Sequence, residues 1–140
     1  RLFQERLGTR FPEIMSRVYF IPRQTEADFL NIIQWSDVLL DPLYTVGGTT
    51  SYETMACGTP LITYPAGRTM RERITYALYQ QMGVLDCVVS SKEEYIDLAI
   101  ALTSNPAFYQ QVKQKILTHC HKIYHNLQGV RELEQLFLSL

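Results

Sequence analysis

The sequence predicts a doubly wound α/β domain, in which helices cover both faces of a parallel sheet. Its short apolar runs lack polar alternation, which is typical of strands buried on both faces. Each run leads into a segment whose apolar residues recur at helical spacing. A chain of 140 residues, 46% of them hydrophobic and 19% charged, is long enough for one such domain with a sizeable core.

The first unit is a predicted strand followed by a predicted helix. Residues 18–21 form a β-rich run that ends at Pro22. Thr25 can then cap a helix, because Asp28 follows three residues later. The apolar side of this helix is formed by Phe29, Leu30, Ile32 and Ile33.

The second unit has the same order, with a glycine loop between strand and helix. Residues 38–40 are a short apolar strand that stops at Asp41-Pro42. The loop that follows leads into a predicted helix over residues 51–57. Gly58 comes directly after this helix, which is the usual position for a glycine that ends one.

A third unit follows, and a fourth strand comes after it. Residues 61–64 are the predicted strand, and a Pro-Ala-Gly turn separates it from a helix over residues 69–82. Gly83 ends that helix. Residues 87–89 predict a brief fourth strand.

The remainder of the chain is predicted to be helical. Ser90-Ser91 can cap one helix, and Asn105-Pro106 supplies an N-cap and a first-turn proline for the next. Gly129 is predicted to separate that helix from a last one. We therefore expect one domain over residues 1–140, made of a lead-in (1–16), a Rossmann-like core (17–104) and C-terminal helices (105–140). The chain begins at Arg1 without a methionine, and we expect it to be a piece of a longer protein.

Composition argues against several classes of partner. A net charge of −1, with scattered Lys and Arg, gives no electrostatic footprint for nucleic acid or an anionic membrane. The apolar runs are strand-sized, so no membrane span is expected, and no leader is recognisable. Three cysteines without zinc spacing indicate unpaired thiols in a reducing compartment, so we expect a cytoplasmic protein.

Residues 46–64 carry the most informative pattern, a glycine loop, a capped helix start and a buried strand. Gly48 and the glycine before it let backbone approach a ligand closely. Thr49 and Thr50 place hydroxyls and free N–H groups at a helix start, where the helix dipole favours phosphate. Glu53 follows on the same face of the first turn, so a carboxylate could accompany the bound anion. A phosphate with a diol nearby describes a nucleotide.

The topology of the predicted sheet also places a ligand beside this glycine loop. In a doubly wound sheet ligands bind outside the carboxyl ends of the strands, where residues 22–25, 41–50 and 65–69 form the loops. The glycine loop has neither the G-x-G-x-x-G spacing of a dinucleotide fold nor the lysine of a phosphate loop. Both absences count against hydride transfer and ATP hydrolysis.

The catalytic region of the protein O-linked N-acetylglucosamine transferase family is similar to three strings of this sequence, RVYFIPRQTEADFLNIIQWSDVLLDP, VGGTTSYETMACGTPLITYP and RERITYALYQQMG, followed by DC and EEY. The sequence resembles the bacterial, TPR-associated members most, from about residue 17 to its end. This resemblance implies a GT-B fold of two Rossmann-like halves. It identifies the chain as the C-terminal half, which holds the sugar-nucleotide donor.

The resemblance also implies roles for individual residues. Gly48, Thr49 and Thr50 match the diphosphate-binding positions, although animal members have histidine at the position of Gly48. Glu53 matches the acidic position used for the ribose hydroxyls.

Two further positions match those that bind the base. Gln24 matches a residue whose backbone contacts the uracil edge. Phe29 falls where animal members have a histidine near the nucleoside, and its ring could still stack on the base.

The implied activity is inverting, metal-independent transfer of a sugar from a nucleoside diphosphate sugar, with UDP-N-acetylglucosamine favoured, to protein Ser or Thr hydroxyls. No cofactor or metal is expected, since the chain has no D-x-D-like signature. The catalytic base stays unassigned. The partners implied are the N-terminal half and a protein acceptor chosen by upstream repeats, so this part alone should bind weakly and catalyse nothing. Two alternatives stay open: an epimerase-like GT-B enzyme, and an inactive module that binds a nucleotide or a protein.

Overall fold

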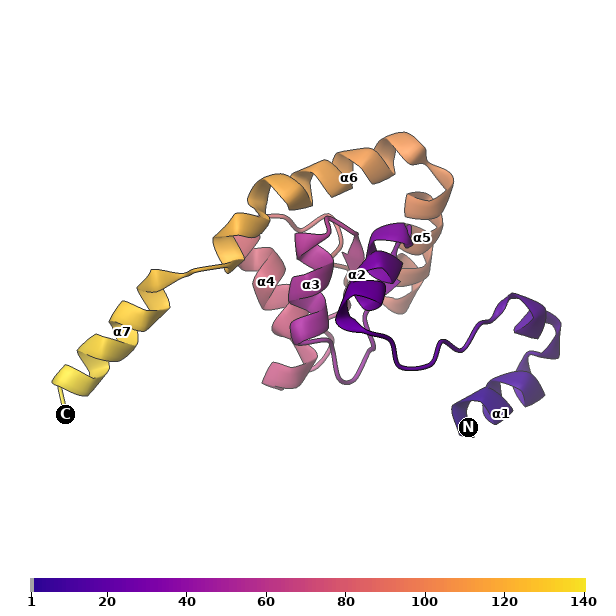
Figure 1. Cartoon of the computed structure of the whole chain (residues 1–140), viewed down its shortest axis with the longest axis horizontal. Coiled ribbons are helices and arrows are strands. Elements are labelled where there is room, and N and C mark those ends of the chain that lie inside the picture. The colour runs from indigo at the N-terminus through magenta and orange to yellow at the C-terminus, as the bar shows by residue number, and fades with distance from the viewer. Residues whose placement is uncertain (1) are drawn as a thin grey trace.

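The computed structural model describes residues 2–140, and Figure 1 shows a central body with one helical segment projecting at each end. In chain order the elements are α1 (Leu2–Arg10), η1 (Pro12–Arg17), α2 (Glu26–Trp35), β1 (Leu39–Leu40), α3 (Thr49–Ala56), β2 (Leu61–Ile62), η2 (Met70–Glu72), α4 (Ile74–Met82), α5 (Lys92–Ser104), α6 (Pro106–His119), η3 (Cys120–Ile123) and α7 (Leu127–Leu138).

The sheet is small and parallel. β1 pairs with β2 in the register Leu39 to Leu61 and Leu40 to Ile62. A single parallel bridge joins Thr63 to Val88, so the predicted fourth strand is present only as this bridge. The parallel order confirms the strand–helix–strand reading, since parallel neighbours need a crossover connection.

The expected first strand is wrong. Residues 18–21 run without strand pairing between η1 and α2. Tyr19 is 82% exposed, and Ile21 is exposed as well. A β-rich sequence becomes a strand only when it finds a ladder partner and a covered face, and this segment has neither within residues 2–140.

Helix starts predicted from capping residues are confirmed. The Thr25 side chain accepts the N–H of Asp28 at 3.2 Å, at the start of α2. Ser91 caps α5, and Asn105 caps α6 with a proline in its first turn. Gly83 ends α4 in the left-handed conformation, with φ of 74°.

Two predicted helix boundaries are wrong. The helix expected over residues 69–82 divides at Arg73. Thr69 and Glu72 form a capping box at the start of η2, and α4 begins at Ile74. Gly129 lies inside α7 rather than before it. The chain breaks instead near His125, whose φ is 53°, and Asn126 caps α7.

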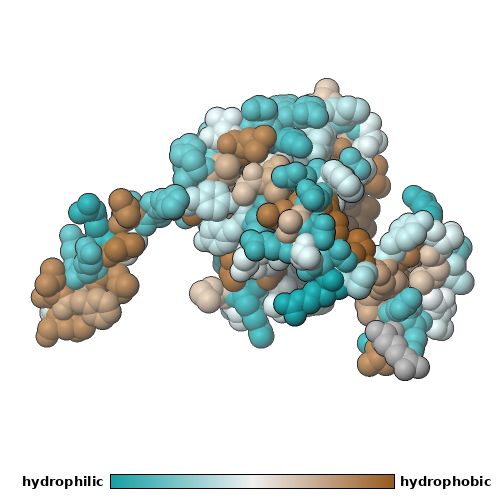
Figure 2. All heavy atoms as spheres, viewed as in Figure 1, coloured by the Kyte–Doolittle hydropathy of each residue, from teal (hydrophilic) through white to brown (hydrophobic). Residues whose placement is uncertain are grey.

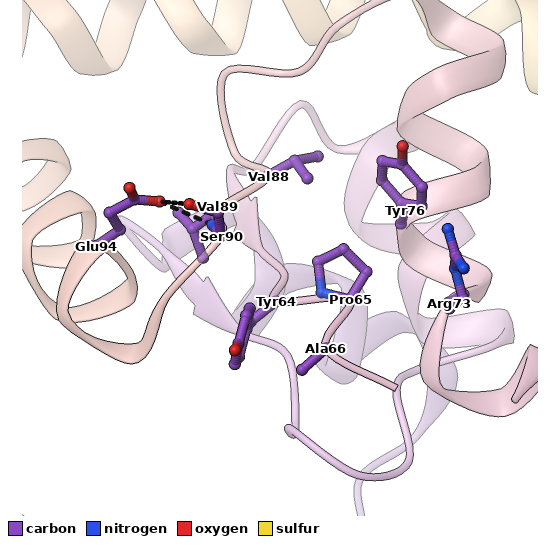
Figure 3. Close-up of a pocket in the computed structure, with 9 residues that line it drawn as sticks. All are labelled: Tyr64, Pro65, Ala66, Arg73, Tyr76, Val88, Val89, Ser90 and Glu94. Carbon is purple, nitrogen blue, oxygen red and sulfur yellow. Dashed lines mark hydrogen bonds between the residues drawn. The ribbon is translucent and has the colours of Figure 1, made fainter. Parts of the chain in front are cut away.

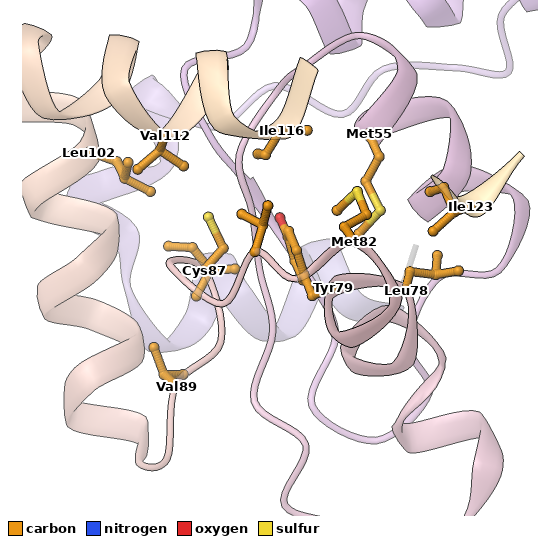
Figure 4. Packing of buried hydrophobic residues seen from close by; sticks show 12 residues of the cluster. Met55, Leu78, Tyr79, Met82, Cys87, Val89, Leu102, Val112, Ile116 and Ile123 are labelled. Atoms are coloured by element: carbon orange, nitrogen blue, oxygen red, sulfur yellow. The ribbon is translucent and has the colours of Figure 1, made fainter. Parts of the chain in front are cut away.

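The core lies between α3, α4, α6 and the sheet (Figure 4). Tyr79 is fully buried in it, and the Leu61 N–H donates to the Tyr79 hydroxyl at 3.1 Å. Cys87 lies in the same cluster, where burial raises the pKa of its thiol to about 12. The α6 helix packs against α3 and α5 and so closes this core.

The last helix stands away from this body. Every described residue of α7 is exposed, including Leu133 and Phe137. Figure 2 shows brown, hydrophobic atoms gathered along it. Among residues 2–140, no helix is long and apolar enough to cross a membrane.

Candidate functional site

The glycine loop begins at the carboxyl end of β1, where Asp41 anchors it. Asp41 is only 3% exposed. Its Oδ1 accepts the N–H of Gly47 at 2.9 Å, and its Oδ2 accepts the hydroxyl of Thr63 at 2.9 Å. The N–H of Val46 donates to the carbonyl of Arg71 at 3.0 Å. The loop is therefore held from both sides just before α3 begins.

The start of α3 leaves anion-binding groups available. Gly48 is the N-cap and provides no side-chain cap, so Thr49 and Thr50 occupy the first turn. Among the described residues, none accepts the backbone N–H of Thr49 or Thr50. The first N–H groups of a helix cannot bond within it, and the dipole makes them a site for negative charge.

The two loop glycines differ in their surroundings. A Cβ at Gly47 would lie 2.7 Å from the Oγ of Ser51, so a side chain does not fit there without movement. A Cβ at Gly48 would meet nothing within 4 Å. Gly47 is therefore required by packing, whereas Gly48 borders open space.

Buried hydroxyls fix α3 against its neighbours. Ser51 and Thr75 share a hydrogen bond of 2.9 Å that joins α3 to α4. Glu53 is half-buried on α3, and its carboxylate has no hydrogen bond or ion pair among residues 2–140. That carboxylate remains available to a ligand.

Three of the expected site residues, Thr50, Gln24 and Phe29, line two separate hollows. One of about 220 Å³ includes Asp41, Gly47 and Thr50. The other, of about 330 Å³, includes Gln24 and Phe29.

These two hollows share no lining residue, and Gly48, Thr49 and Glu53 line neither of them. The Gln24 side chain donates to the carbonyl of Pro22 at 2.8 Å, which folds it back onto its own loop. Phe29 is half-buried and forms part of the wall. The structure thus brings the two expected base residues together in one hollow, whereas Thr50 is the one expected diphosphate residue that lines the other.

A third hollow, of about 450 Å³, lies beyond β2, where the loop over residues 65–69 was expected to border the ligand-binding edge of the sheet (Figure 3). Tyr64 and Pro65 lie between Arg73 and Glu94 in the view shown. The Arg73 guanidinium lies 5.3 Å from the centre of the Tyr76 ring. Hydrogen bonds from the backbone and hydroxyl of Ser90 hold the pKa of Glu94 below its ordinary range.

Asp41 is the residue of this region that the sequence did not single out as part of the site. Its place before a proline gave it only the role of ending a strand. The one available signal was its position at the carboxyl end of a strand, where polar side chains gather in this fold class.

Comparison with known proteins gives consistent matches. The sequence model of glycosyl transferase family 41 matches residues 11–132. The UDP-N-acetylglucosamine–peptide N-acetylglucosaminyltransferase of Caenorhabditis elegans is 25% identical over 101 residues, which are 72% of this chain and 9% of that protein. A solved structure of a mutant O-GlcNAc transferase from Thermobaculum terrenum superposes with a TM-score of 0.80 at 26% identity. That superposition covers 97% of this chain and 27% of the solved one.

The fold is therefore that of a Rossmann-like part of a GT-B glycosyltransferase. The match to the family model covers most of the sequence, and the chain belongs to glycosyl transferase family 41. It spans only a small part of the length of the relatives it matches. The resemblance noted in the three sequence strings is confirmed.

Proposed function

We propose that this chain is the donor-binding half of an inverting, metal-independent glycosyltransferase. The enzyme would move N-acetylglucosamine from its UDP conjugate to Ser or Thr hydroxyls of a protein. The observation that supports this best is the start of α3, where the N–H groups of Thr49 and Thr50 have no acceptor among the described residues. The name of the Caenorhabditis elegans relative gives this donor and a peptide acceptor, and the name of the solved structure gives O-GlcNAc as the group transferred.

In this proposal the diphosphate is bound by Gly48, Thr49 and Thr50, and the ribose hydroxyls by Glu53. Open space beside Gly48 gives the diphosphate room to approach the backbone. The unpaired carboxylate of Glu53 suits a pair of hydroxyl donors.

The base would occupy the hollow lined by Gln24 and Phe29. Stacking on the half-buried Phe29 ring would contribute affinity without selecting the base. Because this hollow and that of the loop are separate, a ligand that joins them would need both a base and a diphosphate.

The chemistry proposed for this half is stabilisation of the leaving group. Breaking the sugar–phosphate bond develops negative charge on the diphosphate. Preorganised N–H and hydroxyl donors at a helix start stabilise that charge without a metal or another cofactor. The base that deprotonates the acceptor is left to the N-terminal half, and acceptor choice to upstream repeats, so this half alone would be inactive.

This proposal also assigns parts of the chain and a location. Residues 17–104 form the Rossmann-like core, preceded by a lead-in and followed by the C-terminal helices from residue 105. We place the protein in the cytoplasm, where nucleotide sugar and protein acceptor would meet.

The test is Thr50→Ala in the complete protein. Losing one donor of a charge-stabilising set typically lowers the rate by about 10²–10³, and we expect that loss in both sugar transfer and donor hydrolysis. Thr118→Ala is the control, because the Thr118 hydroxyl bonds only within α6, to the carbonyl of Gln114. Unchanged kinetics for Thr50→Ala would contradict the assignment, and UDP binding by the wild type without any transfer would favour an inactive module.

A further inference from the structure

We propose that Asp41 is a positioning residue, whose carboxylate holds the glycine loop so that the first turn of α3 faces the donor diphosphate. This inference rests on the proposed function, because it concerns the same anion site. Asp41 itself would not touch the donor and would act through Gly47.

Asp41 is bound to several elements at once. Its N–H donates to the carbonyl of Ile62 at 3.0 Å, and its carbonyl accepts the hydroxyl of Tyr95 at 2.9 Å. The Thr63 hydroxyl occupies its Oδ2. These three contacts fix the residue to the sheet and to α5, and they leave Oδ1 for the loop, where the Gly47 N–H donates at 2.9 Å.

The type of residue is informative because a carboxylate is costly to bury. Among residues 2–140 no cation pairs with Asp41, and its side-chain partners are neutral donors. A buried carboxylate that lacks a cation opposes folding, whereas an apolar residue of the same size would not. What the carboxylate supplies is two acceptors, one of which reaches the loop.

The hydrogen bond to Gly47 acts directly on the proposed site. Gly47 precedes the N-cap, and a Cβ at Gly47 would lie 2.7 Å from the Ser51 Oγ, so this part of the loop packs closely against the first turn of α3. If this bond is lost, the loop just before the N-cap is still held by the hydrogen bond from the Val46 N–H to the carbonyl of Arg71. A looser loop would have to be ordered when the diphosphate binds, and that ordering lowers affinity.

Two substitutions separate positioning from general support. Asp41→Leu keeps approximate size and removes both acceptors. Asp41→Asn can still accept the Gly47 N–H through its oxygen, while its amide donates to the Thr63 hydroxyl.

The experiment is calorimetric titration of the complete protein with UDP and with uridine, which lacks the diphosphate. We expect Asp41→Leu to weaken UDP binding about tenfold, the loss of roughly one hydrogen bond. Uridine binding should change by less than about twofold, and Asp41→Asn should restore UDP binding. Equal losses for UDP and uridine, or equal losses for the two Asp41 variants, would overturn the inference.

Other outcomes separate this inference from the proposed function. A wild-type protein that does not bind UDP would refute the proposed function, and the inference with it. UDP binding that Asp41→Leu leaves unchanged would refute the inference alone. If Asp41→Leu does not fold, the inference is tested instead by hydrogen exchange at the Gly47 amide of the wild-type protein. Protection close to that of the β2 amides supports the anchor, and exchange as fast as in an open loop refutes it.

Discussion

Replacing Gly58 by alanine should destabilise the domain more than the same change at another left-handed glycine. Gly58 follows α3 with φ of 71°, and Gly83 ends α4 with φ of 74°. The backbone conformations are nearly the same. Their surroundings differ, since a Cβ at Gly58 would lie 2.6 Å from the Cγ of Leu117, whereas one at Gly83 would meet nothing within 4 Å.

The expected magnitudes follow from these two environments. The left-handed conformation costs an L-residue about 1–2 kcal/mol, and reduced freedom of the unfolded chain offsets about 0.4–1 kcal/mol. Gly83→Ala should therefore lower the free energy of unfolding by about 1 kcal/mol. Gly58→Ala carries a further overpacking cost of about 1–3 kcal/mol against Leu117. The Cγ is close to the backbone of α6, so it cannot move away without a change of rotamer.

The measurement is native-state hydrogen exchange of the β2 amides in the complete protein, which reports the free energy of opening of this domain. In a Leu117→Ala background the cost of Gly58→Ala should fall to that of Gly83→Ala. A Gly58→Ala cost equal to that of Gly83→Ala in the wild-type background would refute the packing argument. A cost unchanged by Leu117→Ala would show that the strain lies elsewhere.

Two further predictions concern the core. Tyr79→Phe leaves the buried N–H of Leu61 without its acceptor and should lower the free energy of unfolding, measured by urea titration, by about 1–3 kcal/mol. Tyr76→Phe is the control and should change the free energy of unfolding little, because the Tyr76 hydroxyl has no protein partner among the described residues. Equal effects of the two substitutions would contradict this account. For Cys87, folding raises the thiol pKa from 9.0 to about 12, so the folded state holds the proton more tightly. Stability from this group is complete below pH 9 and is lost as pH rises through about 12. The free energy of unfolding should therefore fall less steeply above pH 9 in Cys87→Ala than in the wild type, and parallel pH curves would count against burial of the thiol.

Features whose signal lies within a few residues could be predicted from the sequence. Ser91 and Asn105 cap their helices because the N–H that each side chain accepts is three residues away. Gly83 ends α4 because it adopts positive φ at little cost. The parallel order followed from apolar runs that alternate with helices.

Features that depend on remote partners could not be predicted in this way. Residues 18–21 have the composition of a strand, but pairing is decided by a neighbouring edge that local sequence does not reveal. Gly129 is tolerated within α7, because glycine disfavours a helix only modestly. The role of Asp41 was hidden because the Thr63 that fixes it lies 22 residues further along the chain.

The candidate site shows the same division. Glycine and threonine at a helix start, together with the topology of the sheet, predict an anion site, and the structure shows that the N–H groups of Thr49 and Thr50 there have no acceptor among the described residues. The separation of the two hollows depends on how the loop after residue 21 packs beside α2, which is a tertiary property. The hollow of Figure 3 combines residues from three segments. The loop after β2 was expected at the ligand-binding edge, but local sequence does not show that residues 73–76 and 88–94 join it.

The open space beside Gly48 leaves room for a side chain next to the proposed anion site. The groups that face the anion at the start of α3 include backbone N–H groups, which every residue except proline supplies. Gly48 has φ of −106° and ψ of −93°, a backbone conformation outside the regions that residues with a Cβ prefer, although no neighbour would obstruct a new side chain. A residue with a side chain therefore has room at this position, but the loop backbone has to shift its ψ to accept it. In the proposed site, a change here would alter the chemistry next to the donor at the cost of that local adjustment.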